Sequence, residues 1–520
     1  MQARRASGIV ADSIEPVTEA RQSLARGVSW LLASKVVSFA ITTILPFVLS
    51  RRLPLTEYGY YKQLFVILTT GLNLLPLGMN MSLFYFIPRA KTQSEKGNIV
   101  LNVVIFYLAA TGIAGGALIV HPAFIAQLFH SDPLTVIGRQ IGVVLIAYVV
   151  SPLVEVILIA NGDARLSAIS SVMVTIARTS MILGSALIWG TVFSILWSVF
   201  IVSSLQIVWM AYYVTTRFRG FWRSFRWSVL RSQLIYATPL GLGGLLWSLQ
   251  VDIDNYFVSY YFNAAALAIY ATGCFDVPVV GMLSDSVGAM LIPRISELQA
   301  GNARAEIVAL TVKAMRGLAF AYAPTFVFVW LAATQVITVL FSQKFLASVP
   351  VFRVNLLMVL LAIVAVDPVV RAYKSEHMWM MRINTALLVA LMILLYYATP
   401  RFGLVGAVAS VMFVQYVARA IFVWRISRLL RPHWADLRPL ADVLKTLLSA
   451  AVAGLCIFPL LEPIQKWGAW TSVLSCGVIF MGIYIAGILL LKVPSQSEID
   501  WFLASTVGMI KNRLPGWMAV

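Results

Sequence analysis

The sequence has few charged residues. Asp, Glu, Lys and Arg make up only 12% of its 520 residues, whereas about 25% is usual for soluble domains. Hydrophobic residues account for 60% of the chain, and its mean hydropathy is +0.87. A chain so poor in charge cannot cover several soluble cores with a hydrated surface. The composition therefore predicts one integral membrane unit.

Residues that form covalent and metal sites are also scarce. The chain has three cysteines, Cys274, Cys456 and Cys476, and four histidines. The cysteines fall inside apolar runs and the histidines are scattered, so we expect neither a disulfide framework nor a metal cluster. The sequence has no Gly-rich phosphate loop, and the segments between apolar runs are too short for a soluble catalytic domain. We therefore predict that the protein is not an enzyme and carries no metal or cofactor.

The chain is rich in apolar runs of membrane-spanning length. A transmembrane helix needs about 20 predominantly apolar residues, and on that basis the sequence predicts about 14 spans. Their approximate limits are 28–50, 60–87, 98–120, 139–160, 166–188, 191–213, 234–258, 264–292, 314–341, 350–371, 379–399, 403–424, 443–461 and 470–491. The predicted fold class is an all-α polytopic membrane protein.

The distribution of Lys and Arg predicts the topology. Residues 1–27 contain four arginines but no apolar segment, which is not the pattern of a cleaved signal peptide. With this tail in the cytoplasm, most Lys and Arg lie on the cytoplasmic side, as the positive-inside rule requires. Both termini are then cytoplasmic. The formal net charge of +18 thus reflects topology, and we expect no nucleic-acid partner.

Three pairs of similar segments indicate an internal repeat. The pairs are FYFIPRA (84–90) with MLIPRIS (290–296), AFIAQLFHSDPL (123–134) with QVITVLFSQKFL (335–346), and SPLVE (151–155) with DPVVR (367–371). They occur in the same order at offsets of roughly 205 to 216 residues, and many transporters consist of duplicated bundles. We predict two pseudo-symmetric six-helix bundles followed by an extra helix pair.

The predicted domain organisation has six parts. They are a cytoplasmic tail (1–27), a first six-helix bundle (28–216), a basic and aromatic cytoplasmic linker (217–232), a second six-helix bundle (233–430), an extra helix pair (431–492) and an interfacial C-terminal helix (493–520).

The first two spans carry a resemblance to a known family. The relevant segments are RGVSWLLASKVVSFAITTILPFVLSRRLPLTEYGYYKQLFVI (26–67) and GMNMSLFYFIPR (78–89). A leading span, then LSRRLPLTEYGYY, then a second span that closes in Ile-Pro-Arg, resembles the polysaccharide biosynthesis flippases. These belong to the multidrug/oligosaccharidyl-lipid/polysaccharide (MOP) exporter superfamily. The resemblance covers nearly the whole chain and implies a fold with 14 spans in two lobes, like that of MATE transporters.

The resemblance also implies a function. Such a protein moves an undecaprenyl-diphosphate-linked oligosaccharide from the inner to the outer leaflet by alternating access, in the bacterial cytoplasmic membrane. The glycan serves O-antigen or exopolysaccharide assembly. The implied partners are the lipid-linked oligosaccharide, membrane lipids, and a polysaccharide polymerase with its chain-length machinery.

Two other functions remain open. A multidrug or cation-coupled exporter of the same superfamily is expected to have an acidic cavity, and the basic residue Lys35 argues against this function. A membrane-embedded glycan polymerase or ligase would want a large extracytoplasmic loop, and the longest predicted outer loop, about 120–138, is small.

Basic residues inside spans are candidates for binding an anionic head group. We single out Lys35, Lys62 and Arg178. Lys35 either faces a central cavity or snorkels to the interface, and Lys62 has the alternative role of an interfacial anchor. Arg178 lies near the middle of its span, where an unpaired charge costs roughly 2.5 kcal/mol or more, so it needs a partner or a watery cavity. Arg419 is expected to snorkel.

Acidic residues inside the predicted second bundle are candidates for coupling to H⁺ or Na⁺. Asp252 and Asp254 lie in span 234–258 and Asp276 in span 264–292, and the neutral Asn384 in span 379–399 could join them. The resemblance implies a second-lobe cation site on the seventh span with a contribution from the eleventh. Since helical positions two apart diverge by about 200°, Asp252 and Asp254 cannot both face one cavity. We favour Asp254 for that role.

Two further patterns leave alternatives open. Glu155 and Arg371 occupy matching repeat positions, so they are candidates for a gate across the lobes; the alternative is an i, i+4 pair of Asp367 with Arg371. The segment RFRGFWRSFRWSVLR (217–231) interleaves Arg with aromatic residues. It is interpreted as an interfacial linker, with capture of an anionic head group as the alternative.

Overall fold

The computed structural model describes residues 29–129, 132–218, 225–373, 376–466 and 468–493. Within these residues every regular element is a helix, which confirms the predicted all-α class. The helices divide into two compact units. Unit 1 comprises residues up to Ala271 together with Leu391–Ala407, and unit 2 comprises Thr272–Ala390 and the residues from Val408 onward.

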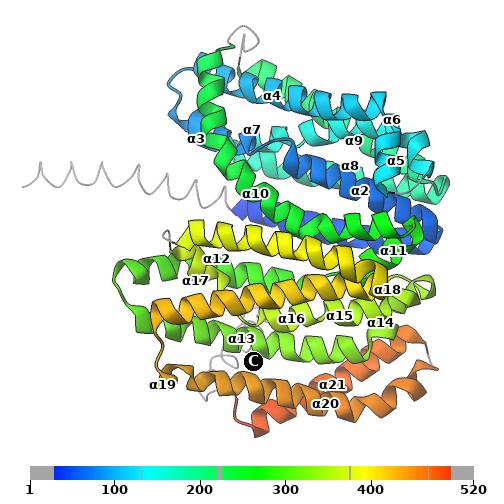
Figure 1. The fold of residues 1–520 in the computed structure, drawn as a ribbon, viewed down its shortest axis with the longest axis vertical. Coiled ribbons are helices and arrows are strands. Elements are labelled where there is room, and N and C mark those ends of the chain that lie inside the picture. The colour runs from blue at the N-terminus through cyan, green and yellow to red at the C-terminus, as the bar shows by residue number, and fades with distance from the viewer. Residues whose placement is uncertain (1–28, 130–131, 219–224, 374–375, 467, 494–520) are drawn as a thin grey trace, which may run out of the picture. The chain divides into compact units, whose positions relative to one another are not determined.

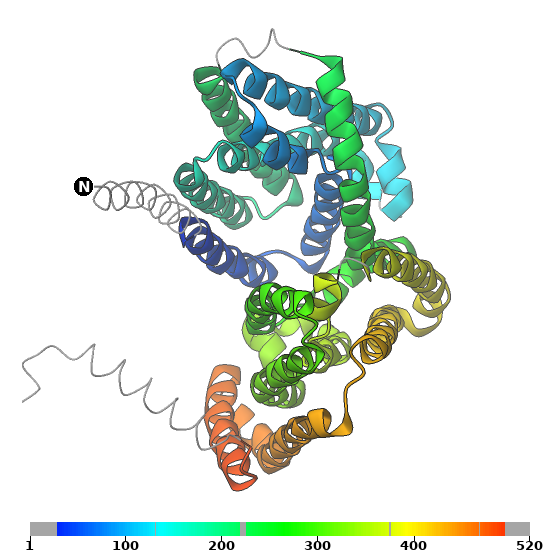
Figure 2. The same ribbon diagram turned by 90° about the vertical axis from the view of Figure 1, so that its left-hand side faces the viewer.

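Unit 1 contains long apolar helices that lie alongside one another (Figures 1 and 2). The first is Ser29–Arg52. The others are α2 (Leu55–Leu74), α3 (Met79–Phe86), η1 (Ile87–Arg89), α4 (Gln93–Val120), α5 (Ala123–Phe129), α6 (Asp132–Val150), α7 (Leu153–Ala160), α8 (Ala164–Ile188), α9 (Val192–Arg217) and α10 (Trp227–Tyr261), followed by most of α11 (Ala264–Gly273).

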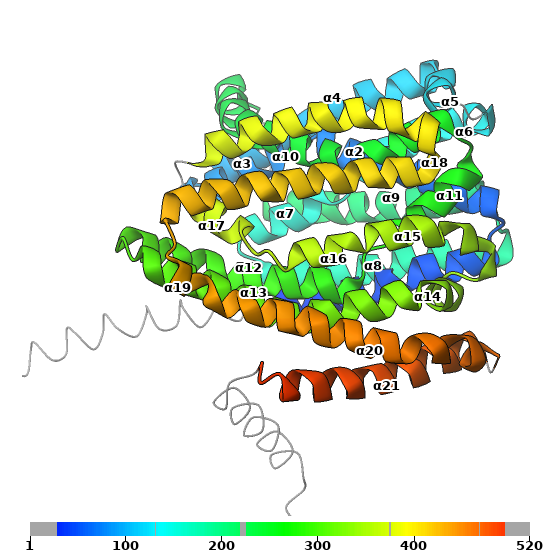
Figure 3. The ribbon, with the colours of Figure 1, turned by 60° about the horizontal axis from the view of Figure 1, so that its bottom comes forward.

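Unit 2 is built in the same way. Its helices are α12 (Pro278–Ala300), α13 (Arg304–Leu331), α14 (Ala333–Leu340), η3 (Gln343–Ser348), α15 (Val349–Asn355), α16 (Leu357–Ala362), α17 (Asp367–Ala372), parts of α18 (His377–Leu430), α19 (Trp434–Leu437), η5 (Arg438–Leu440), α20 (Ala441–Gln465) and α21 (Ala469–Leu490). Helices α20 and α21 pack against each other (Figure 3) and α20 also packs on α13. This corresponds to the predicted extra helix pair.

Helix α18 consists of two helices joined by a reversal. Gly403 has φ 64° and ψ −150° inside the element, a conformation that glycine tolerates because it has no Cβ. A Cβ on Gly406 would lie 2.5 Å from the carbonyl oxygen of Ala398, although residues eight apart in a straight helix are separated by about 12 Å. The chain therefore turns back here, as predicted between spans 379–399 and 403–424.

The spans in the described residues agree with the predicted number. Eleven helices are long and apolar enough to cross a membrane, and there are up to 13 when each of two bent helix pairs forms one span. Since α18 contains two spans, the total is about 14. The protein is a multi-pass membrane protein.

The order of elements shows the same pattern twice. In each half a long helix (α4, α13) is followed by a short one (α5, α14) and then by a span broken near its end (α6 and α7; α15, α16 and α17). Both breaks carry a proline, Pro152 at the start of α7 and Pro368 in the first turn of α17, and these prolines belong to the repeated segments SPLVE and DPVVR. A proline removes a backbone donor and favours the first turn of a helix, which explains why both helices restart there.

Contacts divide the chain differently from the predicted bundles, because α10, most of α11 and residues Leu391–Ala407 of α18 belong to unit 1. α10, the predicted first span of the second bundle, packs on α2, α3 and α4 and belongs to unit 1. Its close crossing with the break between α2 and α3 depends on two glycines. A Cβ on Gly241 would lie 2.2 Å from the carbonyl carbon of Leu77, and a Cβ on Gly78 2.6 Å from the carbonyl oxygen of Ala237. The bundle boundary expected from the repeat stays a prediction.

The tails lie outside the described residues. They include the predicted cytoplasmic tail 1–27 and nearly all of the predicted interfacial helix 493–520.

Candidate functional site

The two aspartates of α10 differ in their surroundings. Asp254 is buried, and its carboxylate accepts hydrogen bonds from the hydroxyl of Tyr270 at 2.6 Å and from the backbone N–H of Asn255 at 2.9 Å. Asp252 is half-buried, and no described residue donates a hydrogen bond to it. Asp254 is thus the carboxylate that is satisfied inside its own unit. Which of the two carboxylates takes up a proton or a cation stays a prediction.

Asp252 lies on a polar seam between α10 and α2. The seam has two hydrogen bonds: Tyr256 donates its hydroxyl hydrogen to Thr70 Oγ1 at 2.8 Å, and Asn73 donates to Ser248 Oγ at 2.9 Å. Ser248 and Tyr256 are four residues before and four after Asp252, so the three share one helix face.

The seam is also where α10 bends. The helix changes direction by 43° between Leu246 and Ser248. A carboxylate surrounded by hydroxyl and amide groups can hold a proton or a small hard cation. Sequence reasoning missed Thr70 and Asn73. The available signal was a pair of neutral polar residues three apart in an otherwise apolar span.

The lysine candidates lie in the first two spans. Lys35 is exposed in helix Ser29–Arg52. Lys62 is half-buried on α2, with its Nζ 5.4 Å from the ring centre of Tyr58 and 6.0 Å from that of Tyr61. Such cation–π contacts hold the ammonium in place, which suits the alternative role of Lys62 as an anchor. Head-group binding by either lysine stays a prediction.

Arg178 has partners within unit 1. From α8 it donates to Gln206 Oε1 of α9 at 3.3 Å, and its guanidinium lies 5.2 Å from the ring centre of Tyr148 of α6. It also interacts electrostatically with Glu155 of α7. These contacts supply the partner that its mid-span position required. The roles of Arg178 in head-group binding and of Glu155 in a gate stay predictions.

In unit 2 the break between α16 and α17 holds a partly buried ion pair. Arg419 Nη1 lies 2.6 Å from Asp367 Oδ2 and donates to the carbonyl oxygen of Val364 at 3.0 Å. The Arg419 side chain is only 19% exposed, so the expectation that it snorkels was wrong. Its guanidinium instead lies at the break, where the carbonyl oxygen of Val364 accepts from it and also from the backbone N–H of Val366 at 2.9 Å.

The ion pair lines a cavity of about 280 Å³. Asp285 and Ser284 of α12 lie on its wall, together with Arg371 of α17. Arg371 belongs to unit 2 and Glu155 to unit 1, so the gate hypothesis concerns residues of different units.

The remaining coupling candidates belong to unit 2. Asp276 lies in a non-helical segment, residues 274–277, because the predicted span 264–292 is two helices, α11 and α12, rather than one. Asp276 accepts a hydrogen bond from Asn355. Asn384 is half-buried on the first arm of α18. Among the described residues, no three His, Cys, Asp or Glu side chains are placed to hold a metal ion.

A second ion pair in unit 2 was not predicted. Arg425 donates from Nε and Nη2 to the two carboxylate oxygens of Glu376, at 2.7 and 3.1 Å. The pair links the two ends of the α18 hairpin. The sequence gives no local signal for a contact between residues 49 apart. Once the hairpin of α18 is assumed, however, an acid and a base at its two ends are expected to face each other.

Comparison with known proteins agrees with this architecture. Residues 48–350 match a family described as "Polysaccharide biosynthesis protein". A curated relative, an uncharacterized membrane protein of Methanocaldococcus jannaschii, is 22% identical over 273 residues, which are 49% of this chain and 50% of that protein. The chain thus spans about half the length of the curated relative it matches.

Two solved structures show the same fold at low sequence identity. The lipid II flippase MurJ, in an inward closed conformation, gives a TM-score of 0.65 at 13% identity, over 89% of this chain and 100% of that chain. An inward-facing multidrug resistance MATE family transporter of the MOP superfamily gives 0.60 at 15% identity, over 76% of this chain and 95% of that chain. With more than half of its length matched by the family model, the chain belongs to the polysaccharide biosynthesis protein family and has the MOP superfamily fold.

Proposed function

We propose that this protein is a flippase that moves an undecaprenyl-diphosphate-linked oligosaccharide from the inner to the outer leaflet of the bacterial cytoplasmic membrane. The glycan would be an O-antigen or exopolysaccharide unit, handed on to a polymerase and its chain-length machinery. The proposal rests on one combined observation: the chain belongs to the polysaccharide biosynthesis family and is similar, over the whole length of that protein, to a structure named as a lipid II flippase.

The charges inside the spans support an anionic cargo. Lys35 of the first span is exposed, and the described residues provide no carboxylate within hydrogen-bonding distance of it. A lysine in that position can meet a diphosphate, whereas an exporter of cationic drugs has no use for it. The proposed mechanism is alternating access, because two similar half-structures can rock about a shared site.

The polar seam of α2 and α10 supports coupling to a cation. Asp252 supplies a half-buried carboxylate beside the bend of α10, where a change of charge can alter the angle between the two parts of the helix. We propose H⁺ or Na⁺ coupling at Asp252, with Asp254 holding α11 through Tyr270.

The test is the location of the lipid-linked oligosaccharide in a deletion strain. We expect the intermediate to accumulate in the inner leaflet and the surface glycan to disappear. Lys35→Ala should reproduce this loss partly and Lys35→Arg should restore function. Lys313→Ala, which removes an exposed lysine of α13, is the matched control. Normal surface glycan and undisturbed lipid intermediates in the deletion strain would exclude the flippase function.

A multidrug exporter is the second candidate because of the similarity to a MATE transporter structure. It predicts efflux of cationic dyes from cells that express the protein, with no change in lipid intermediates. Measuring both quantities in one strain separates the two functions.

A further inference from the structure

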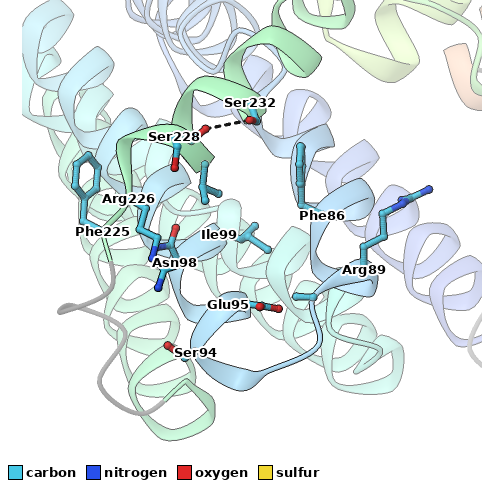
Figure 4. A pocket seen from close by; sticks show the side chains of 12 residues that line it. Phe86, Arg89, Ser94, Glu95, Asn98, Ile99, Phe225, Arg226, Ser228 and Ser232 are labelled. Atoms are coloured by element: carbon cyan, nitrogen blue, oxygen red, sulfur yellow. Dashed lines mark hydrogen bonds between the residues drawn. The ribbon is translucent and has the colours of Figure 1, made fainter.

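A cavity of about 550 Å³ lies where α3 and η1 end and where α4 and α10 begin. Its volume is in the range of small-molecule sites. Its polar wall includes Arg226, Ser94, Asn98, Ser228 and Ser232, and its apolar wall includes Phe86, Ile99, Phe225 and Val229. In Figure 4 the two serines of α10 and Phe86 lie on different sides of the cavity, and Ile99 lies below them.

A chain of hydrogen bonds fixes the orientation of Asn98. The carbonyl oxygen of Ile99 can only accept a hydrogen bond, so the Gln233 amide atom beside it must be the donor Nε2 (3.2 Å). The same Nε2 also donates to Ser82 Oγ (3.3 Å). The other amide atom of Gln233, Oε1, then accepts from Asn102 Nδ2 (3.3 Å). The same Nδ2 donates to Asn98 Oδ1 (3.0 Å). Asn98 therefore has to present its Nδ2 donor on the side away from Asn102.

This donor is buried and has no partner among the described residues. Asn98 is only 4% exposed, it is one of the residues that line the cavity, and its Nδ2 makes no hydrogen bond with any described residue. Buried polar groups in native proteins are nearly always hydrogen-bonded. Asn98 cannot gain a partner by flipping its amide, because the carbonyl oxygen of Ile99 fixes the orientation of every amide in the chain. An acceptor that reaches Nδ2 from the cavity would satisfy this donor.

The charge of the cavity favours an anion. Arg226 is the residue before α10 and makes no side-chain cap, so the first N–H groups of this 35-residue helix are open to a ligand. A helix N-terminus carries a partial positive charge, and the Arg226 guanidinium adds a full one. The wall also carries one acid, Glu95, whose Oε2 accepts from the backbone N–H of Lys91 (2.8 Å) and of Thr92 (3.4 Å). Two arginines of the wall, Arg89 and Arg226, outweigh its charge.

The apolar wall and the position of the cavity favour a lipid. α4 and α10 are membrane-spanning helices, and both begin at the cavity, which places it at the boundary between membrane and water. Phe86, Phe225 and Val229 can contact glycerol and the upper acyl chain, while the polar wall binds the phosphate.

We propose that this cavity binds the phosphate group of a lipid. Asn98 Nδ2, the start of α10, and Arg226 donate to the phosphate oxygens. The site is confined to unit 1, and binding of a phospholipid there does not depend on the transport activity proposed above. A polyprenyl phosphate is the second source of the same chemistry, and in that case the cavity is a capture site for the cargo.

The test is lipid binding to the full chain in detergent, measured by native mass spectrometry. The probes are phosphatidylglycerol, undecaprenyl phosphate, and diacylglycerol, which lacks the phosphate. We expect one phosphate-bearing lipid to bind in preference to diacylglycerol. Whichever of the two binds more tightly identifies the source.

Two variants separate the site from general lipid adhesion. Asn98→Asp keeps the shape and the Oδ1 that accepts from Asn102, but it replaces the donor by an acceptor. Arg226→Gln removes the charge. Each should weaken binding about tenfold, as expected for loss of a hydrogen bond to a charged group. Arg165→Gln, which removes an arginine that stacks on Trp30 at 5.4 Å, is the control and should bind like the original chain.

The proposal is overturned if diacylglycerol binds as well as phosphatidylglycerol, or if both variants keep full affinity. Thermal unfolding of each variant checks that a loss of binding is not a loss of folding. A variant that unfolds at the original temperature and yet binds about tenfold more weakly supports the site.

Discussion

The crossing of α10 with the break between α2 and α3 makes a sharp prediction for Gly241→Ala. A Cβ at this position would lie 2.2 Å from Leu77 C, 2.3 Å from Leu77 O and 2.6 Å from Gly78 N. All three are backbone atoms, so no side-chain rotation can relieve the overlap. Contact distances for carbon are about 3.5 Å or more, so the two segments would have to separate by more than 1 Å, roughly. Closely packed helices in membranes depend on small residues at such positions.

The expected loss of folding free energy is large for the addition of one methyl group. Overpacking usually costs about 1–3 kcal/mol, and we expect the upper end, about 3 kcal/mol, because backbone has to move. Gly243→Ala and Gly244→Ala are matched controls on the same helix, since a Cβ at either position meets nothing within 4 Å. Both controls should be neutral or stabilising by up to about 1 kcal/mol through higher helix propensity.

The assay is thermal unfolding of the purified protein in one detergent, followed by tryptophan fluorescence and size-exclusion chromatography. We expect Gly241→Ala to unfold well below the original chain and the two controls to unfold at or above it. If Gly241→Ala were as stable as Gly243→Ala, the close approach of these backbones would be refuted.

One ion pair and one hydrogen bond give further predictions. Asp367→Asn should destabilise unit 2 by roughly 2 kcal/mol, less than a fully buried pair because Asp367 is 38% exposed. The double variant Asp367→Leu with Arg419→Met should be more stable than Asp367→Leu alone, which leaves the arginine unpaired. Additive losses in the cycle formed by Asp367→Leu, Arg419→Met and the double variant would argue against the pair. Tyr270→Phe should cost about 1.5–3 kcal/mol, because it removes a hydrogen bond to the buried Asp254. In the Asp254→Asn variant, Tyr270→Phe should lower the stability much less. Equal losses of stability from Tyr270→Phe in the original chain and in Asp254→Asn would show that this hydrogen bond contributes little.

The internal repeat was visible in the sequence only as three weak matches. SPLVE and DPVVR share little beyond a proline, yet both mark the restart of a broken span. Proline acts on the local backbone, so its effect survives when the surrounding residues diverge. The Ile-Pro-Arg match was less informative about structure, because residues 87–89 form a 3₁₀ turn whereas Pro293 lies inside α12.

The apolar spans, their number and the all-helical class could be predicted because they follow from properties of short segments. A run of about 20 apolar residues in lipid must satisfy its own backbone, and a helix is the way one segment can do so. The same local rules gave the hairpin at Gly403. They failed for 264–292, which was predicted as one span although residues 274–277, with Asp276 among them, interrupt the helix.

Only the tertiary structure decided which charged groups are paired. Arg419 and Asp367 are 52 residues apart, and the sequence alone assigned Arg419 to the interface. Asp252 and Asp254 are equivalent as letters in an apolar run, and their difference comes from Tyr270, a residue of the next helix. Composition determines that a chain must enter the membrane and where each segment crosses it. The cost of a charge inside depends on atoms a few ångströms away, which belong to other segments, and so its role is fixed only when the helices pack.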